Sequence, residues 1–434
     1  MTDPAPSPLV PQERSRLVAA LAERFPAADP VCGAWDALPR GGRAAALAAL
    51  ERIDPAAYAA TRNHVGGRVT GLSPWIRHGV LGLAEVRDRA LAIAGGPPGA
   101  EKLVSELAWR DYWHRVEGAI GDGIRTAIEP PAAVPRAPWA ADLPADVATA
   151  STGVACIDAF ARKLVHTGHL HNHERMWLAA WLVHVRGVDW RAGADWFLRH
   201  LVDGDPASNH LSWQWVAGTF SAKPYLARRR TIEGCTDGLH CRGCALAEDC
   251  PFDGDDEAIA TAAFLGPASR PSLRIPPSAP WRPAPDAPPP ARPLVWLTLD
   301  AASTVNPAVL GHPAAPRVYV IEREWLEGER PSLKRLVFLF ECLADMPGVL
   351  VGVGDPAAIL PVLAARLGCD GVAVAESTIP RVRRAAEALA RHMPLSIHPW
   401  PRFVDASAVR DLGRFSRYWQ AVRDSSLRPT PAGD

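Results

Sequence analysis

The proline-rich stretch over residues 267–293 divides this chain into two segments with different hydrophobic patterns. Before it, apolar residues recur at the three- and four-residue spacing of amphipathic helices, and no alternating strand pattern is found. After it, β-branched runs such as 294–300 and 317–322 alternate with helical segments, which is typical of a parallel sheet. We therefore predict a multidomain chain, with an all-α domain over 1–266, a semi-rigid linker and a small α/β domain over 294–434.

Charge and apolar content narrow the class of protein. Lys and Arg together number 47, as do Asp and Glu, so no overall field points to nucleic acid, although a local basic patch remains compatible with this balance. The first residues contain no apolar signal-peptide core, and no apolar run is long enough to span a membrane. The sequence thus predicts a soluble, cytoplasmic protein that acts as a monomer.

One polar and aromatic stretch, "HLVDGDPASNHLSWQWV", concentrates groups that can carry chemistry. Asp203 and Asp205 are acceptors at a helix-to-turn junction, and Asn209 can both donate and accept. Trp213 and Trp215 follow within six residues. The simplest interpretation is an Asx turn followed by a helix with a buried Trp. Yet the chain has 16 Trp, most of them before residue 216, and a buried indole N–H needs a partner, so this concentration calls for more than packing.

Five motifs, in order, make this segment resemble the photolyase/cryptochrome family. The stretch above is similar to that family's "DGDxAxNxxxWQW" pattern. The others are "YAATRNHVGGRVTGLSPWIRHG" (58–79), "SELAWRDYW" (105–113), "GHLHNHERMWLAAWLV" (168–183) and "VDWRAGADWF" (188–197). The resemblance spans about residues 41–226. It implies a helical FAD-binding domain followed by an antenna-like α/β domain.

The resemblance also implies which side chains hold the cofactor. Arg175 and Asp203 match a buried ion pair across the flavin, Asp205 lies at its edge and Asn209 near its N5 atom, whereas a purely structural role for the ion pair stays open. Hydroxyls and a guanidinium suit the diphosphate. The full set of implied FAD-binding residues is Tyr58, Arg62, Thr70, Leu72, Ser73, Trp109, Arg110, Asn172, Arg175, Asp203, Asp205 and Asn209.

The same resemblance implies a pocket for damaged DNA and an electron relay. Glu106 matches the carboxyl group that bonds the pyrimidines, Trp109 and Trp215 match the stacking walls, and Met176 matches a thioether at the pocket; Asn209 completes this catalytic set. The alternatives are a surface pair of Glu106 with Arg110 and core packing of Trp109 beside Trp113. Relay positions are matched by Trp213, Trp190 and Trp139. Candidate DNA-facing cations are Arg77 and Arg228–Arg230.

Four cysteines lie within sixteen residues of the helical segment. Cys235, Cys241, Cys244 and Cys250 have the spacing C-x5-C-x2-C-x5-C, which in a cytosolic chain indicates a metal site. Thiolates suit both a [4Fe–4S] cluster, which we favour, and zinc. The remaining cysteines, Cys32, Cys156, Cys342 and Cys369, are expected to be isolated and buried.

The order of the two predicted domains departs from the family. "RPLVWLTLDAASTVNPAV" (292–309) resembles the opening of the family's N-terminal antenna domain and "GRFSRYWQAVRDS" (413–425) its end, so we predict a circular permutation. "LTLDAAS" replaces the family's charged "RxDLR", which leaves the antenna chromophore unknown. The function implied is light-driven repair of pyrimidine dimers by a photolyase-type lyase. The alternatives are a cryptochrome-like photoreceptor and a light-independent flavoprotein or iron–sulfur DNA-binding module.

Overall fold

The computed structural model describes residues 6–10, 13–28, 35–282 and 288–430. Cys32 and residues 283–287 of the predicted linker lie outside them. Within these ranges, the structure has no helix that is both long enough and apolar enough to cross a membrane.

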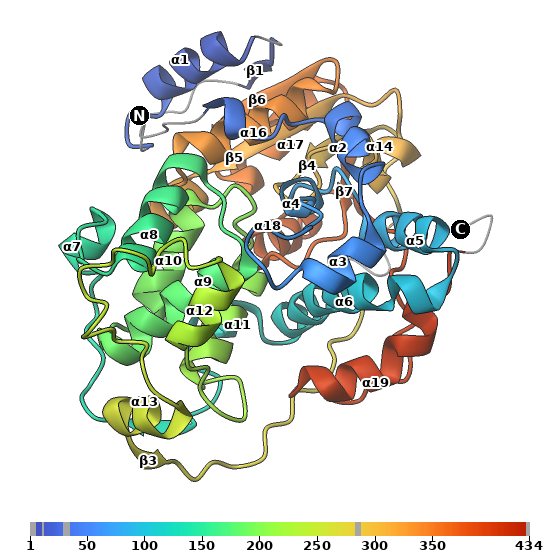
Figure 1. Ribbon diagram of the computed structural model, residues 1–434. Helices are drawn as coiled ribbons and strands as arrows, with labels where there is room; N and C mark the ends of the chain where they lie inside the picture. Colours follow the sequence, from blue (N-terminus) through green and yellow to red (C-terminus); the bar gives the residue numbers. More distant parts are fainter. Residues whose placement is uncertain (1–5, 11–12, 29–34, 283–287, 431–434) are drawn as a thin grey trace.

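A six-stranded sheet forms one layer of the molecule, in the order β1-β6-β5-β4-β7-β8 (Figure 1). All of its strands except β1 run parallel to one another, which confirms the predicted parallel α/β arrangement. They are β4 (Pro293–Leu297), β5 (Arg317–Glu322), β6 (Val349–Gly354), β7 (Gly371–Ala375) and β8 (Leu395–His398). Because β4 lies between β5 and β7, the chain reverses its direction of winding at the carboxyl ends of β4 and β7.

The helices that connect and flank these strands follow the alternation seen in the sequence. They are α14 (Pro307–Gly311), α15 (Arg323–Gly328), α16 (Leu333–Ala344), α17 (Pro356–Arg366), α18 (Pro380–Ala390) and the final helix α19 (Phe415–Ser426). Fully buried apolar strand residues, for example throughout β4 and β7, explain why these runs read as continuous hydrophobic stretches.

The segment before the linker is mainly helical, as its periodicity predicts. Its helices are α1 (Arg14–Arg24), α2 (Arg43–Leu50), α3 (Pro55–Thr61), α4 (Ser73–Arg77), α5 (Leu83–Ala94), α6 (Pro97–Ile120), α7 (Ala145–Ala148), α8 (Ala155–Thr167), α9 (Asn172–Ala180), α10 (Trp190–His200), α11 (Pro206–Ala217), α12 (Arg229–Cys235) and α13 (Asp256–Ala263). Short 3-10 turns lie at Trp35–Ala37 and Gly121–Arg125, and a π-helical turn, Trp181–Val185, extends α9.

Three short strands make the all-α description of residues 1–266 wrong in detail. β1 (Ser7–Pro8) pairs antiparallel with β6 and so joins the sheet of the other segment. β2 (Ala133–Pro135) and β3 (Phe264–Pro267) form a separate two-stranded ribbon. Strands of two to four residues are too short to produce a visible alternation, so periodicity had no means of finding them.

Hydrophobic packing divides the molecule differently from the proline-rich stretch. One core joins the amino-terminal helices to the sheet, with Leu21, Val104, Leu297 and Phe338 among its members. A second core lies within residues 147–252 and contains most of the indoles of α9 to α11. The ion pair Arg14–Glu341, at 2.7 Å, ties α1 to α16 across the first core. The residues on both sides of the linker therefore share one hydrophobic core.

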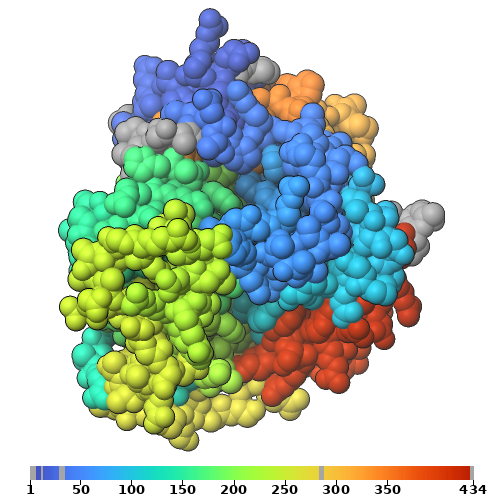
Figure 2. Space-filling model, in the orientation of Figure 1, coloured from blue at the N-terminus to red at the C-terminus, as the bar shows by residue number. Residues whose placement is uncertain are grey.

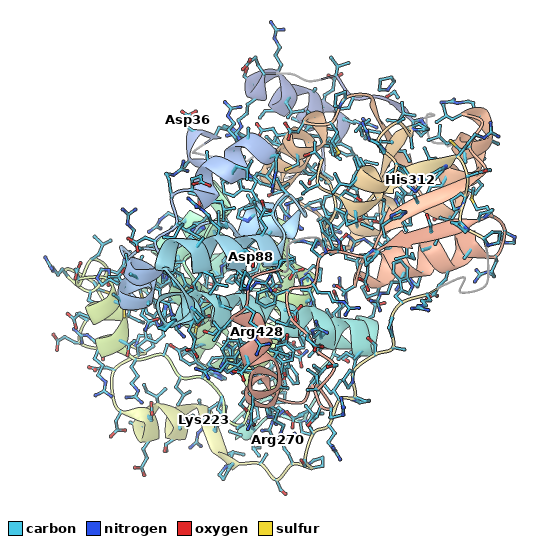
Figure 3. The ribbon with its side chains drawn as sticks, turned by 90° about the vertical axis from the view of Figure 1, so that its right-hand side faces the viewer. Asp36, Asp88, Lys223, Arg270, His312 and Arg428 are labelled. Atoms are coloured by element: carbon cyan, nitrogen blue, oxygen red, sulfur yellow. The ribbon has the colours of Figure 1, made fainter. Side chains whose placement is uncertain are left out.

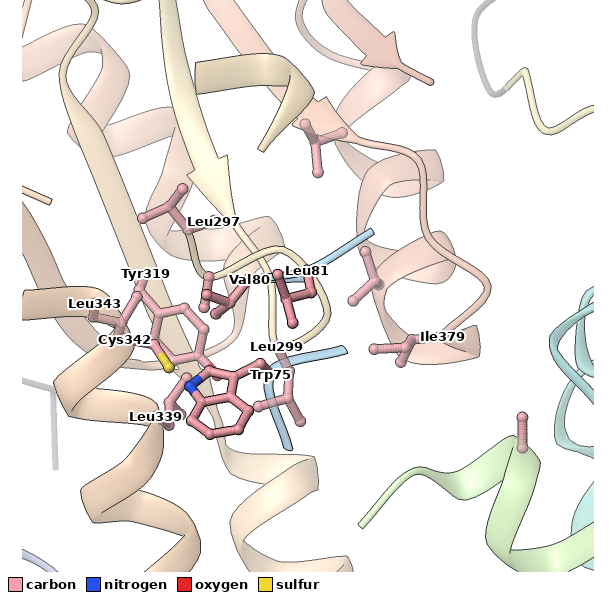
Figure 4. Packing of buried hydrophobic residues seen from close by; sticks show 14 of the residues in the cluster. Trp75, Val80, Leu81, Leu297, Leu299, Tyr319, Leu339, Cys342, Leu343 and Ile379 are labelled. Carbon is pink, nitrogen blue, oxygen red and sulfur yellow. The ribbon is translucent and has the colours of Figure 1, made fainter. Parts of the chain in front are cut away.

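The end of α4 and the turn after it pack on the carboxyl ends of the strands. Trp75, Val80 and Leu81 are 6%, 0% and 1% exposed and lie among Leu299 after β4 and Ile379 before α18 (Figure 4). The turn passes so close to β4 that a Cβ atom on Gly79 would lie 2.2 Å from the carbonyl oxygen of Asp300. Gly79 also has φ +65°, which other residues rarely adopt. The helical segment thus fills the crevice where the winding reverses.

Candidate functional site

A cavity of about 470 Å³ lies between α6, α9, α10 and α11. All five residues of the predicted catalytic set line it, together with most of the predicted cofactor set. The lining residues that the sequence predicted are Arg62, Glu106, Trp109, Arg110, Asn172, Arg175, Met176, Asp203, Asp205, Asn209, Trp213 and Trp215. Residues that are more than a hundred positions apart in the sequence therefore meet around one space.

Asp205 begins α11 and concentrates charge at the floor of the cavity. Its carboxylate accepts a hydrogen bond from the backbone N–H of Ser208 at 3.1 Å, the arrangement of a helix N-cap, and Pro206 occupies the first helical position. The Nε2 atom of His114 lies 2.9 Å from the Asp205 carboxylate, and Arg110 lies 3.7 Å from it. Although burial alone raises the pKa of this carboxyl group, His114 and Arg110 hold it well below its usual value.

Asp203 pairs with Arg175, as the family resemblance implied. Arg175 Nη2 donates to both carboxylate oxygens, at 3.0 and 2.9 Å, and its Nε donates to the carbonyl of Leu170 at 3.0 Å. Burial favours the neutral acid, but the charge of Arg175 and a hydrogen bond from Ser73 lower the pKa of Asp203 to about 2. Both α4 and α9 thus hold this carboxylate in its ionised form.

Helix α10 orients two residues of α11 that face the cavity. The amide nitrogen of Asn209 donates to the carbonyl of Ala194 at 2.9 Å. The indole of Trp213 lies against Gly193, where a Cβ atom would stand 2.2 Å from the ring. Gly193 therefore permits the close approach of α10 and α11 that places Trp213 at the cavity.

Glu106 lies in a network of cations at the cavity wall. Its carboxylate lies 3.0 Å from Arg62 and 2.8 Å from Lys102, one turn earlier on α6. The alternative pairing of Glu106 with Arg110 is wrong, because Arg110 is directed toward Asp205. The guanidinium of Arg62 also lies over the ring of Tyr58, 5.9 Å from its centroid.

Aromatic side chains provide the walls of the cavity. Trp109 stacks on Phe415 of α19, with ring centroids 3.7 Å apart, and also contacts Trp113 at 4.9 Å. Trp215 packs against Tyr225 at 5.6 Å. Trp109 therefore has the core packing that the alternative interpretation expected and still lines the cavity.

Four residues of the predicted cofactor set do not line the cavity directly. Tyr58 lies behind Arg62, and burial, followed by the charge of Glu106, raises its pKa to about 12. Ser73 reaches the site through Asp203. Thr70 and Leu72 lie at the start of α4, where Leu72 is fully buried. Tyr58 and Ser73 thus contact residues that line the cavity, whereas no such contact is found for Thr70 or Leu72 among the described residues.

Of the three predicted relay residues, one lines the cavity and the other two lie in or beside the second core. Trp213 lines the cavity, whereas Trp190 is buried in the second core and is 1% exposed. Trp139 is half-buried at the edge of that core. Backbone hydrogen bonds of Ala140 to Gly187 and Asp189 place Trp139 beside the start of α10, where Trp190 lies. No direct ring contact joins the three indoles among the described residues.

A polar row on α6 was missed by the sequence interpretation. Glu106, Arg110, His114 and Glu117 recur at helical spacing, and this repeat along one face of the helix was the available signal. Thr378 donates to Glu117 Oε2 at 2.7 Å and lies 3.4 Å from His114 Nδ1. The row connects the floor of the cavity to the α/β segment.

Replacing Glu117 with Gln is expected to stabilise the protein at pH 8 by about 3 kcal/mol. Burial raises the pKa of Glu117 to about 7, against 4.5 for the free group. Folding therefore favours the protonated acid: the stability it contributes is full below pH 4.5 and is lost as the pH rises through 7. Urea unfolding of both proteins at pH 5 and pH 8 measures the difference. A gain of the same size at both pH values would contradict this assignment.

The predicted metal site is not supported. Cys241, Cys244 and Cys250 line a small apolar cavity beside α8, but Cys235 is not part of its lining, and Cys156, expected to be isolated, is. Among the described residues, no group of three or more His, Cys, Asp or Glu side chains is placed to hold a metal ion. The structure therefore does not support the predicted iron–sulfur or zinc site on Cys235, Cys241, Cys244 and Cys250.

The candidate DNA-facing cations are also revised. Arg77 is 1% exposed, and its Nε donates to the carbonyl of Gly204 at 3.0 Å, so it is part of the interior. Arg228 pairs with Asp256, and Arg229 lies 3.5 Å from Asp253. Arg230 is the member of that run that is exposed to solvent.

The residues around the cavity fit a flat, polar cofactor. Both indoles and charged side chains line the cavity. Arg110 Nη2 is buried without a hydrogen-bond partner among the described residues. A buried donor of this kind is costly unless a ligand supplies an acceptor. An isoalloxazine ring offers both an aromatic face and carbonyl acceptors, so the site suits FAD.

Comparison with known proteins agrees with this geometry. Residues 103–237 match the family model described as the FAD binding domain of DNA photolyase. A deoxyribodipyrimidine photo-lyase of Streptomyces griseus is 40% identical over 156 residues, which are 36% of this chain and 33% of that protein. A cryptochrome DASH of Ostreococcus tauri is 35% identical over 192 residues, which are 41% of this chain and 35% of that protein.

A solved cryptochrome structure from Synechocystis sp. PCC6803 aligns with a TM-score of 0.41 and 26% identity, and covers 45% of this chain and 43% of that one. This chain thus spans a third to less than half of the length of the relatives it matches.

Proposed function

Since the helical segment of this chain belongs to the DNA photolyase and cryptochrome family, we propose that the protein binds FAD and uses light to split pyrimidine dimers in damaged DNA. The observation that carries the proposal is the convergence of Glu106, Asn209, Trp109, Trp215 and Met176 on one cavity. These residues come from three helices, α6, α9 and α11, so helical packing alone does not require them to meet.

The ion pair Arg175–Asp203, the carboxylate of Asp205 and the amide of Asn209 would hold the flavin ring. Asp203 and Asp205 stay ionised in the folded protein, so both accept hydrogen bonds at fixed positions. Arg62 and the hydroxyl of Thr70 would hold the phosphates, because guanidinium and hydroxyl groups suit anionic oxygens, and Ser73 would act through its hydrogen bond to Asp203. FAD, when bound in its reduced form, supplies the electron that light transfers to the lesion.

The aromatic walls would hold the damaged bases. Trp109 and Trp215 present indole faces on which a flipped-out pyrimidine pair can stack. Glu106 would bond the pyrimidines, and its ion pairs with Arg62 and Lys102 limit where its carboxylate can lie. Met176 contributes an apolar surface between these polar groups, and the Nδ2 atom of Asn172 lies 3.4 Å from its sulfur.

We further propose that Trp213, Trp190 and Trp139 carry electrons between the cavity and the surface. The order of their exposure, from a cavity wall through a buried position to a half-buried one, supports this direction. The circular permutation also stays a proposal, supported by the match of only the helical segment to the family model.

A cryptochrome-like photoreceptor without repair activity is the second candidate. Relatives named cryptochrome DASH, such as the one from Ostreococcus tauri, support it. The two functions differ in whether a lesion is turned over under blue light, and the cavity geometry is compatible with both. A defined repair assay therefore decides between them.

Replacing Glu106 with Gln is expected to lower the rate of light-driven repair by about a hundredfold, because a fixed hydrogen-bonding group at developing charge is worth that much. Bound FAD should be unchanged, because Glu106 is not among the residues proposed to hold the cofactor and Gln keeps its size. The assay uses single-stranded oligonucleotides with one cyclobutane or one (6-4) lesion under blue light.

The control is Glu51→Gln, because the exposed Glu51 pairs with Arg89 of α5 and does not line the cavity. Its repair rate should stay within twofold of the parent protein. If the FAD-loaded parent protein repairs neither lesion, the repair proposal fails and the photoreceptor replaces it.

A further inference from the structure

The indole of Trp109 has one of its two faces covered by the last helix of the chain. Its ring and that of Phe415 are nearly parallel, at 12°, with centroids 3.7 Å apart. Trp419, one turn further along α19, continues the stack behind Phe415, at 6.2 Å and 14°. Because Trp109 also lines the cavity, the part of its ring that Phe415 and Trp113 leave uncovered is available to a ligand.

Helix α19 is fixed on α6 at several points, so this contact is part of the fold. Tyr418 donates to Asp111, and Arg423 bonds Glu101 at 2.6 Å. The hydroxyl of Tyr112 donates to the carbonyl of Leu412 at 2.8 Å. In Figures 1 and 2, α19, in red, lies along the outside of the cyan α5 and α6 segments.

The residues after α19 are held as well. The backbone N–H of Thr430 donates to Asp88 of α5 at 3.2 Å, and the Thr430 hydroxyl accepts from Arg87 at 2.7 Å. Asp88 and Arg428 mark this junction in Figure 3. Contacts on both sides of Phe415 thus limit how far its ring can move from Trp109.

We propose that Phe415 is a positioning residue of the substrate pocket, which fixes the indole of Trp109 so that its free face can stack on the flat bases of a bound lesion. This inference rests on the proposed function for the nature of the ligand. An indole with one face against a rigid ring keeps fewer orientations, and a prearranged wall loses less conformational entropy when a ligand binds. The carboxyl-terminal helix therefore supplies part of a site that the matched family segment does not contain.

Replacing Phe415 with Ala should weaken binding of a lesion-containing oligonucleotide about tenfold, since a stacking wall is worth about that factor or more per base. Binding is measured in the dark by fluorescence anisotropy, with the full-length, FAD-loaded protein. FAD content and the repair rate of saturated protein should stay within twofold, because Phe415 does not line the cavity. Phe415→Tyr should restore binding.

Trp419→Ala is the matched control, because Trp419 stacks on Phe415 but makes no ring contact with Trp109 among the described residues. It should bind within twofold of the parent protein. If Phe415→Ala binds as tightly as the parent while Trp109→Ala binds weakly, the inference is overturned. Should Phe415→Ala fail to fold, Phe415→Leu keeps the volume without the flat face and gives the same test.

A separate readout distinguishes this inference from the proposed function. Acrylamide quenching of Trp109, taken as the difference between each protein and its Trp109→Phe counterpart, should increase when Phe415 is replaced by Ala. If the parent protein shows no preference for lesions but this increase occurs, the proposed function fails and the positioning role stands. An unchanged quenching constant overturns the positioning role.

Discussion

Replacing Arg335 with Met is expected to release FAD and to lower the free energy of unfolding by about 3 kcal/mol. Arg335 belongs to α16 of the α/β segment and is 2% exposed. Its Nη2 donates to the carbonyl of Gly204 at 2.9 Å, and its Nη1 donates to Leu198 and to Glu329. Gly204 separates Asp203 from Asp205, and its carbonyl would keep only the donor from Arg77, so the turn that carries both carboxylates of the proposed flavin site is held less firmly.

Flavin absorbance after gel filtration and urea unfolding measure the two effects. Arg335→Lys should recover little, because an ammonium group lacks the planar fork that reaches two carbonyls and a carboxylate together. Arg366→Met, at an exposed position of α17, is the matched control and should keep both FAD and stability. An Arg335→Met protein that binds FAD with unchanged affinity would refute this role for α16.

Replacing Asp203 with Asn should lower the free energy of unfolding by about 3 kcal/mol at pH 7, because Arg175 is left without its carboxylate partner. The loss should depend on pH. The pKa of Asp203 is about 2 in the folded protein, against 3.8 for the free group. This depressed pKa contributes about 2 kcal/mol of stability above pH 3.8, which is lost as the pH falls through 2.

Urea unfolding at pH 3, 5 and 7 tests this dependence. The difference in stability between the parent protein and Asp203→Asn should be largest at pH 5 and 7 and should shrink at pH 3. Ser73→Ala, which removes only a hydrogen bond to the same carboxylate, should show a smaller difference with the same sign. A difference that does not change with pH would mean that Asp203 is not held ionised by Arg175.

The family motifs, taken in their order along the chain, were enough to predict which residues of α6, α9 and α11 line the cavity. Asp203, Asp205 and Asn209 lie within seven residues of one another, so local geometry alone keeps them close. Their partners on other elements were accessible only through family resemblance, as with Arg175. His114 and Glu117 were missed because no motif includes them, although their helical spacing from Arg110 indicated a polar face.

Contacts between segments distant in the sequence were outside the reach of pattern reading. Nothing in the spacing of residues 413–425 indicates that Phe415 stacks on Trp109, about three hundred positions earlier. The cysteines illustrate the same limit. Their spacing grouped Cys235 with Cys241, Cys244 and Cys250, whereas in the structure Cys156 takes its place beside those three. Local periodicity specifies elements, but the packing of side chains decides which elements meet.

The packing of Trp75, Val80 and Leu81 at the ends of β4 and β7 has an optical consequence. In doubly wound sheets, small molecules bind in the crevice at these ends, and here close-packed hydrocarbon occupies it. A second pigment bound there would have to displace three nearly inaccessible side chains. If the proposed light-driven activity is present, its action spectrum should therefore contain no band from a pigment bound in this crevice.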